Sequence, residues 1–223
     1  DGLAAPVTDQ EALARTIFRG KAQTLDNIGP LVRGALMLPR ERIALPEWKA
    51  DQDGVLDRVM AAFPAQIVAV RSSASSEDGL HASGAGKYRT VLDVSTAKRE
   101  SLAAAIRSVV ESYSSGGRSP DGRDEVLIQP QLTDLRASGV LLTRDPRTSA
   151  PYFVLNEDSA SGRSDVVTAG GAGAIHQHFV AWPAREEPSL QADVRRVLGL
   201  AHELIELSQL DALDIEYAVS NDD

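Results

Sequence analysis

VRSSASSEDGLHASGAGKYRTVLDV, residues 70–94, is the stretch that decides how this chain is interpreted. An apolar strand, IVAV at 67–70, runs directly into Arg71 and a series of small residues. Gly79, Gly84 and Gly86 follow, and Lys87 comes directly after the last of them. Glycines let a backbone approach a ligand closely and turn its N–H groups toward an anion. With a cation at either end, the segment favours a loop that binds nucleotide phosphates.

A second interpretation of the same glycines needs no ligand. They could serve only the turns of a long hairpin, with Arg71 paired to Glu77 or Asp78. The known short phosphate motifs do not decide the matter, because the segment contains neither GxxxxGK[ST] nor GxGxxG.

Composition excludes several classes of protein. The chain has 223 residues, 43% of them hydrophobic and 25% charged, as in ordinary globular domains. A net charge of −9 argues against a nucleic-acid-binding surface, and no apolar run is long enough for a membrane helix. The absence of cysteine excludes disulfides and thiolate chemistry. We therefore expect a cytoplasmic protein that binds neither nucleic acid nor membrane. Because the chain begins with Asp1, we expect it to be a piece of a longer protein.

Apolar spacing and turn signals predict a mixed α+β chain of two lobes. The loop SSGGRSPDGRD at 114–124 separates an N-terminal lobe, residues 1–115, from a C-terminal lobe, residues 124–223. Helical patterns cover 8–19, 21–28, 47–63, 101–113 and 190–207, and strand-like runs cover 67–70, 89–94, 125–129, 139–143, 152–155, 165–168, 177–182 and 212–219.

Three segments in a fixed order resemble one known family. VRSSASSED with ASGAGKYRTVLDV, then ASGVLLTRDPRTSAPYFVLNE at 137–157, then LDIEYAV at 213–219 are similar to blocks of the phosphoenolpyruvate synthase and pyruvate phosphate dikinase family. GKAQTL at 20–25 is a looser fourth match. The resemblance implies a two-lobed ATP-grasp nucleotide-binding domain with its nucleotide cleft between the lobes. The family's LQxRP motif, which normally follows the last block, is missing.

The phosphate-binding residues follow from the chemistry and from this resemblance. Arg71 at a strand end suits a phosphate clamp, since a guanidinium binds phosphate oxygens through two parallel hydrogen bonds. The resemblance gives Lys21 a similar role, so both are candidate catalytic residues. The candidate loop comprises Ser83, Gly84, Ala85, Gly86 and Lys87.

The resemblance also implies positions for the base and the ribose. The strand EVLIQPQL at 125–132 matches the one that leads to the adenine hinge, with Gln129, Gln131 and Leu132 as candidates. Glu157, which follows the strand YFVLN, would contact the ribose or the adenine side. A simple strand end is the alternative for the hinge.

Two carboxylates share a face near the end of the chain. Asp214 and Glu216 alternate with apolar residues, so on a strand both point to the same side. Mg²⁺ prefers hard oxygen ligands and bridges ATP phosphates, and the resemblance puts Glu216 at a metal position. Acidic side chains facing water on a half-exposed strand are the alternative.

The sequence thus predicts a Mg-ATP-binding part of an ATP-dependent phosphotransferase. The resemblance implies that a phosphoryl group passes from ATP to a histidine on a swivelling domain of the same polypeptide, or to a small-molecule acceptor. A non-catalytic nucleotide-binding or regulatory module of the same fold is the first alternative, since the LQxRP motif is missing. An ATP-dependent ligase is the second, because ATP-grasp folds also activate carboxylates.

Overall fold

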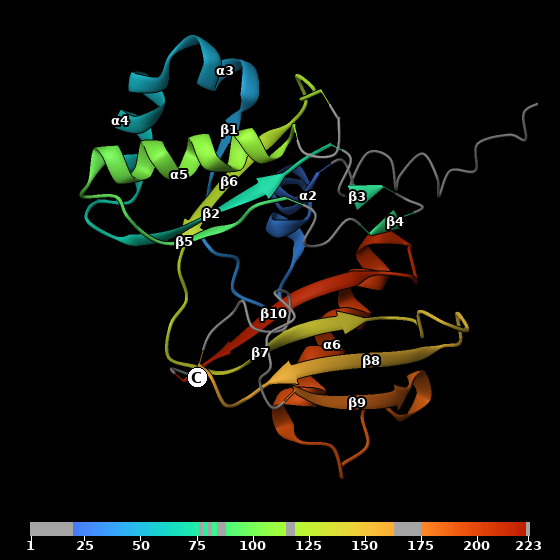
Figure 1. Cartoon of the computed structure of the whole chain (residues 1–223). Coiled ribbons are helices and arrows are strands. Elements are labelled where there is room, and N and C mark those ends of the chain that lie inside the picture. Colours follow the sequence, from blue (N-terminus) through green and yellow to red (C-terminus); the bar gives the residue numbers. More distant parts are fainter. Residues whose placement is uncertain are drawn as a thin grey trace, which may run out of the picture. The chain divides into compact units, whose positions relative to one another are not determined.

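The computed structural model describes residues 20–75, 78–79, 82–83, 88–114, 119–162 and 175–221 (Figure 1). The chain divides into two compact units. Among the described residues, the N-terminal unit comprises those within 20–30 and 37–131, and the C-terminal unit comprises those within 31–36 and 132–221. Each unit has its own antiparallel sheet and its own apolar core. The predicted α+β class is therefore confirmed.

The N-terminal unit is built on a four-stranded antiparallel sheet. The strands β1 (Glu41–Ala44), β2 (Ile67–Ser73), β5 (Val91–Ser95) and β6 (Glu125–Pro130) lie in the order β1-β6-β2-β5. A small separate hairpin pairs β3 (Asp78–Gly79) with β4 (Ala82–Ser83). The helices are α2 (Lys21–Ile28), α3 (Leu45–Ala50), α4 (Gln52–Ala62) and α5 (Arg99–Ser112), with a 3₁₀ turn at Gly29–Leu31.

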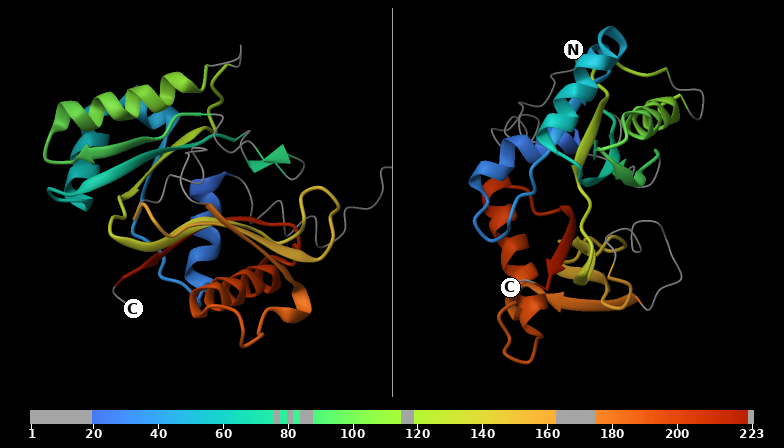
Figure 2. Two further views of the ribbon diagram at one scale, coloured as in Figure 1. Left: turned by 60° about the horizontal axis from the view of Figure 1, so that its bottom comes forward. Right: turned by 90° about the vertical axis from the view of Figure 1, so that its left-hand side faces the viewer.

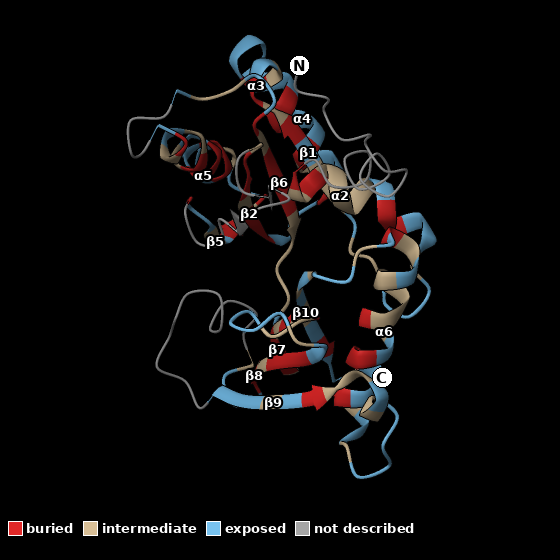
Figure 3. Ribbon diagram, turned by 90° about the vertical axis from the view of Figure 1, so that its right-hand side faces the viewer, coloured by how far each residue is buried: buried red, intermediate tan, exposed pale blue. Residues whose placement is uncertain are grey.

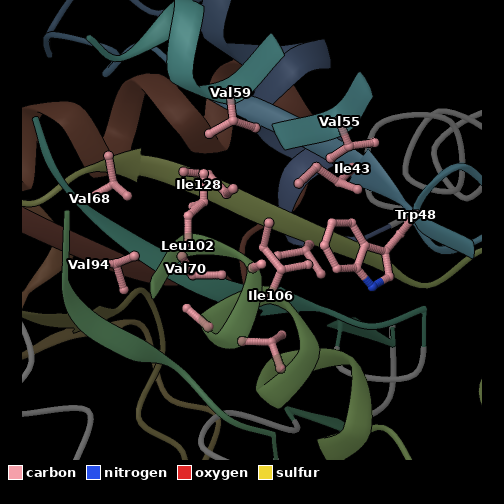
Figure 4. Packing of buried hydrophobic residues seen from close by; sticks show 14 of the residues in the cluster. Ile43, Trp48, Val55, Val59, Val68, Val70, Val94, Leu102, Ile106 and Ile128 are labelled. Carbon is pink, nitrogen blue, oxygen red and sulfur yellow. The ribbon is translucent and has the colours of Figure 1, made fainter. Parts of the chain in front are cut away.

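Helices α4 and α5 cover one face of this sheet. On α5 the buried residues Leu102, Ile106 and Val109 recur at helical spacing, and they meet Val68 and Val70 of β2 in one core. Figure 4 shows side chains from α4, α5, β2 and β6 packed together there. Because side chains alternate along a strand, the residues of β2 between these valines point to the opposite face.

The predicted helix at 47–63 is two helices. Asp51 ends α3 and begins α4, and its side chain accepts a hydrogen bond from the backbone N–H of Gly54 at 2.9 Å. An aspartate at this position caps the first turn of a helix. The apolar spacing runs through both helices, since Trp48, Val55 and Val59 belong to the same core.

The C-terminal unit contains the second antiparallel sheet. The strands β7 (Leu135–Leu142), β8 (Tyr152–Asp158), β9 (Ile175–Ala181) and β10 (Asp214–Ser220) lie in the order β10-β7-β8-β9. A short 3₁₀ helix, η3 (Trp182–Ala184), precedes the long helix α6 (Ala192–Ser208). Figure 2 shows α6 running along one face of the sheet.

The core of the C-terminal unit lies between α6 and that sheet face. Leu141, Phe153 and Leu155 from the strands meet Val194 and Leu198 from α6. Figure 3 colours the buried residues of α5 and α6 red, and on both helices they alternate with exposed ones. We call the other side of the C-terminal sheet, turned away from α6, the distal face.

The division between the units differs from the predicted lobes. The sequence placed the boundary in the loop before residue 124, whereas the first unit extends to Gln131. The reason is β6, which pairs with β1 on one side and with β2 on the other and so completes the N-terminal sheet.

Most of the other predicted elements are found within one to four residues of their expected ends. The predicted helix at 8–19 and the predicted strand at 165–168 lie outside the described residues. Among the residues that the structure describes, no helix has the length and apolar character needed to cross a membrane.

Candidate functional site

Arg71 lies near the end of β2 on the sheet face opposite α4 and α5. Its neighbours Val70 and Ser72 point to the other side, and its partner in register on β6 is Leu127, which is fully buried. Ser73, two residues further along, shares the face of Arg71. Arg71 as a whole residue is partly exposed. Arg71 thus stands near the end of β2, ahead of the three glycines of the segment.

The end of β2 is held in place by hydrogen bonds from two other elements. The backbone N–H of Ser73 donates to the hydroxyl of Tyr113 at 3.1 Å. The backbone N–H and the hydroxyl of Ser75 both donate to Oδ1 of Asp124, at 3.0 and 3.1 Å. Asp124 is fully buried. The strand that carries Arg71 is therefore fixed up to the point where the glycine-rich segment begins.

Lys21 is brought to the same strand end. It is the first residue of α2, after Gly20, which has an extended conformation and no side chain to cap the helix. The backbone N–H of Ala22 donates to Oγ of Ser73 at 2.9 Å. The N-terminus of α2 therefore lies against β2 two residues beyond Arg71. A helix N-terminus carries partial positive charge, which adds to the charges of the two side chains.

The glycine-rich loop is described only in part. Ser83 lies on β4 and pairs in register with Asp78 of β3, so a hairpin stands within this segment. The predicted loop residues Gly84, Ala85, Gly86 and Lys87 lie outside the described residues.

The predicted hinge residues have different surroundings. The backbone N–H of Gln131 donates to the carbonyl oxygen of Ile67 at 3.0 Å. Its side chain exchanges two hydrogen bonds with Asp93, at 2.6 and 2.7 Å. Asp93 adopts a left-handed conformation with φ of 59°, which turns its backbone N–H toward this amide. The position of Gln131 thus gives no support to a backbone contact with adenine.

Gln129 and Leu132 differ from Gln131 in this respect. Gln129 lies opposite Ala69 of β2 and shares the sheet face of Arg71. Leu132 follows β6, and within the described part of the chain its N–H makes no hydrogen bond. The backbone N–H of Leu132 thus differs from that of Gln131, which donates to Ile67.

Asp214 and Glu216 share the distal face of the C-terminal sheet. Ile215 and Tyr217, which alternate with them on β10, pack against the core beneath α6. Both carboxylates are exposed. The predicted arrangement of two acids on one strand face is confirmed. No group of three or more His, Asp or Glu side chains suited to a metal occurs among the described residues.

Glu157 lies on the opposite face from these carboxylates. It is in register with Gly139 of β7, and it is only 5% exposed. The hydroxyl of Tyr217 donates to Oε2 of Glu157 at 3.0 Å, and burial, together with the nearby carboxylate, raises the pKa of Tyr217. This position gives no support to the predicted contact with ribose, because Glu157 points toward α6.

Asn156, which precedes Glu157, was not among the site residues predicted from the sequence. Across the sheet, Glu216 lies opposite Val140, Val140 opposite Asn156, and Asn156 opposite Gln177, so the four form one row on the distal face. The amide of Gln177 donates to Oδ1 of Asn156 at 2.7 Å. The alternation of side chains along β8 could have identified it. Because Phe153 and Leu155 face the core, Asn156 must face the opposite side.

Two solved structures are similar to this chain at low sequence identity. D-alanyl-alanine synthetase A from Vibrio cholerae O1 biovar eltor str. N16961 has 13% identity and a TM-score of 0.48, with 95% of this chain and 54% of that chain covered. A D-cycloserine synthetase has 11% identity and a TM-score of 0.38, with 82% of this chain and 55% of that chain covered. This chain thus spans about half the length of each. No curated protein matches it.

The family model matches the part of the chain that contains Arg71. Residues 50–119 match the model described as pyruvate phosphate dikinase, AMP/ATP-binding domain. This stretch begins at the end of α3 and contains α4, the strands β2 to β5 and α5. The match includes the glycine-rich segment at 70–94 from which the resemblance was first read. Over residues 50–119 the chain therefore matches a nucleotide-binding domain of the pyruvate phosphate dikinase type, which confirms the resemblance predicted from its sequence.

Proposed function

We propose that this chain is the Mg-ATP-binding part of an ATP-dependent phosphotransferase similar to phosphoenolpyruvate synthase. The observation that carries the proposal is the meeting of Arg71 and the N-terminus of α2 at the end of β2, joined by the hydrogen bond from Ala22 to Ser73 at 2.9 Å. It lies next to the glycine-rich segment, within the nucleotide-binding match.

Arg71 and Lys21 bind the phosphates of ATP in this proposal. Arg71 supplies a planar pair of donors and Lys21 a flexible point charge, which suits adjacent phosphate groups. Gly84, Ala85, Gly86 and Lys87 complete the phosphate contacts, together with Ser83. Because β2 is fixed by Tyr113 and Asp124, Arg71 is already oriented before the nucleotide arrives. Such preorganisation reduces the entropy lost on binding.

Glu216 is the proposed ligand of Mg²⁺, with Asp214 as the second carboxylate. Mg²⁺ keeps several water ligands and is usually bound by one or two carboxylates plus the phosphates, so a group of three acids is not required. Asn156 stands two strands away from Glu216 in the same row, roughly 10 Å apart at the usual strand spacing. Asn156 would add a polar side chain to this face when the metal is bound.

The residues of this chain act by positioning and by neutralising charge. In phosphoryl transfer the acceptor attacks phosphorus as the bond to the leaving oxygen breaks, and cations stabilise the oxygens that carry the charge. The acceptor in the proposal is a histidine on a further domain of the same polypeptide, or a small molecule. The base would be bound through Gln129 and Leu132, whereas the side chains of Gln131 and Glu157 are engaged in contacts within the protein.

Single-turnover phosphoryl transfer tests the enzymatic part of the proposal. The protein, in excess over Mg-ATP, is mixed with candidate acceptors, and ADP and phosphorylated products are followed by ³¹P NMR. We expect transfer that stops when EDTA removes the metal and that falls about 10- to 100-fold in Arg71→Ala, as the loss of a charged hydrogen bond implies. Arg107→Ala, which removes an exposed arginine on α5, is the matched control.

The two alternatives give different results in the same experiment. A non-catalytic module binds Mg-ATP but yields no phosphorylated product with any acceptor. A ligase yields an acyl phosphate only when a carboxylate acceptor is present, and hydroxylamine traps it as a hydroxamate. Transfer that is equal in Arg71→Ala and Arg107→Ala would remove Arg71 from the mechanism.

A further inference from the structure

A second cationic position occurs in the C-terminal unit. Arg185, Glu186, Arg195 and Gly199 line a pocket of about 270 Å³. Arg185 directly follows η3, and Arg195 and Gly199 lie one turn apart on α6. Two arginine residues thus line one hollow in a chain whose net charge is −9.

The charges of this pocket are only weakly satisfied by the protein. Arg185 pairs with Glu186 at 3.2 Å, but the Glu186 side chain is 83% exposed. Ion pairs exposed to this degree contribute little to stability, so an incoming anion can replace Glu186 at small cost. Arg195 is exposed and makes no ion pair with the described part of the chain.

Gly199 leaves the backbone of α6 uncovered at the edge of this pocket. It is the eighth residue of the 17-residue helix α6, where glycine is less favourable than any residue except proline. Packing does not require it, because a Cβ added at Gly199 would meet no heavy atom within 4 Å. At Gly139, by contrast, a Cβ would lie 2.3 Å from the carbonyl oxygen of Asn156. A missing side chain in open space at the edge of a pocket leaves room for a ligand close to the helix backbone.

We propose that this pocket binds the oxyanion group of a small molecule, a carboxylate or a phosphate, through Arg185 and Arg195. The planar guanidinium fork matches both groups, and two arginines supply more donors than one oxyanion can use. Arg185 exchanges Glu186 for the ligand, and Gly199 lets the ligand approach α6. This site is distinct in residues from the proposed phosphate contacts at Arg71 and Lys21.

The test is an NMR titration of the whole chain with two probes, inorganic phosphate and acetate, at constant ionic strength. We expect saturable shifts of the backbone amides of Glu186 and Gly199, and the probe with the lower Kd identifies the oxyanion. Arg195→Gln should weaken binding about tenfold, as expected for one charged hydrogen bond. Arg196→Gln, which removes the adjacent exposed arginine outside the pocket, should change it less than twofold.

Gly199→Leu separates binding from folding. Leucine raises the helix propensity of α6 while filling the space above the backbone, so the variant should bind less and unfold at a higher temperature. The same titration of the Arg71→Ala variant removes any response that arises from probe binding at the proposed nucleotide site. The proposal is overturned if neither probe gives saturable shifts at Glu186 and Gly199. Equal affinities in Arg195→Gln and Arg196→Gln overturn it as well.

Discussion

Gly139 and Gly199 differ in whether the surrounding structure has room for a side chain. Gly139 lies on β7 under the hydroxyl of Tyr217, 2.9 Å from the position that a Cβ would take, and closer still to the backbone of Asn156. A side chain there would push β8 away from β7 and disturb the hydrogen bond between Tyr217 and Glu157. Gly199 has no such neighbour.

We predict that alanine has opposite effects at these two positions. Gly139→Ala should lower the free energy of unfolding by about 2 kcal/mol or more, in the range found for overpacked cores. Gly199→Ala should raise it by about 0.5–1 kcal/mol, the difference in helix propensity. Urea unfolding followed by circular dichroism measures both. A Gly139→Ala variant as stable as the wild type would contradict the close approach of β7 and β8.

Tyr217 and Glu157 form a buried polar pair that belongs to the fold. Tyr217→Phe removes the donor and leaves a carboxylate that is 5% exposed without that bond. We predict a loss of about 1–3 kcal/mol in the free energy of unfolding, the usual cost of leaving a buried group unsatisfied. Mg-ATP affinity, measured by calorimetry, should stay within twofold, because the pair faces α6. A large loss of affinity in Tyr217→Phe would return Glu157 to the nucleotide site.

The sequence showed which face of the strand the candidate residues occupy for β10 but not for β8. On β10, apolar and acidic residues alternate, so the shared face of Asp214 and Glu216 could be read directly. On β8, the run YFVL is apolar on both sides and hides the alternation. The family resemblance drew attention to Glu157, whereas register places Asn156 in the row of Glu216.

At the level of elements, local patterns predicted most helices and strands. The break between α3 and α4 was missed, because the apolar spacing continues across it and only the cap at Asp51 marks the new start. Pairing between distant strands could not be predicted either. Nothing in EVLIQP states that β6 lies between β1 and β2, and the predicted lobe boundary therefore fell before β6 instead of after it.

Asp51 provides a test at this scale. Asp51→Ala removes the acceptor for the N–H of Gly54, and we predict a loss of about 1 kcal/mol in the free energy of unfolding. Asp51→Asn keeps a capping oxygen and should cost little. Urea unfolding of both variants makes the comparison. If alanine and asparagine prove equally stable, the side chain does not cap α4.

At the scale of the whole molecule, each unit carries one part of the proposed chemistry. The N-terminal unit contains Arg71 and Lys21 on one side of its sheet, and the C-terminal unit contains Asp214 and Glu216 on the distal face of its own. The fold class and the place of Arg71 near the end of β2 were predictable because they rest on short contiguous motifs. The surroundings of Gln131 were not, because Asp93 lies 38 residues away in the sequence.

The central claim is that Arg71 holds the phosphates of ATP, and calorimetric titration with Mg-ATP tests it most directly. We predict saturable binding by the wild type and by Arg107→Ala, and an affinity about 10- to 100-fold lower for Arg71→Ala at unchanged thermal stability. An absence of Mg-ATP binding by the wild type at millimolar concentration, or equal affinities for Arg71→Ala and Arg107→Ala, would contradict the claim.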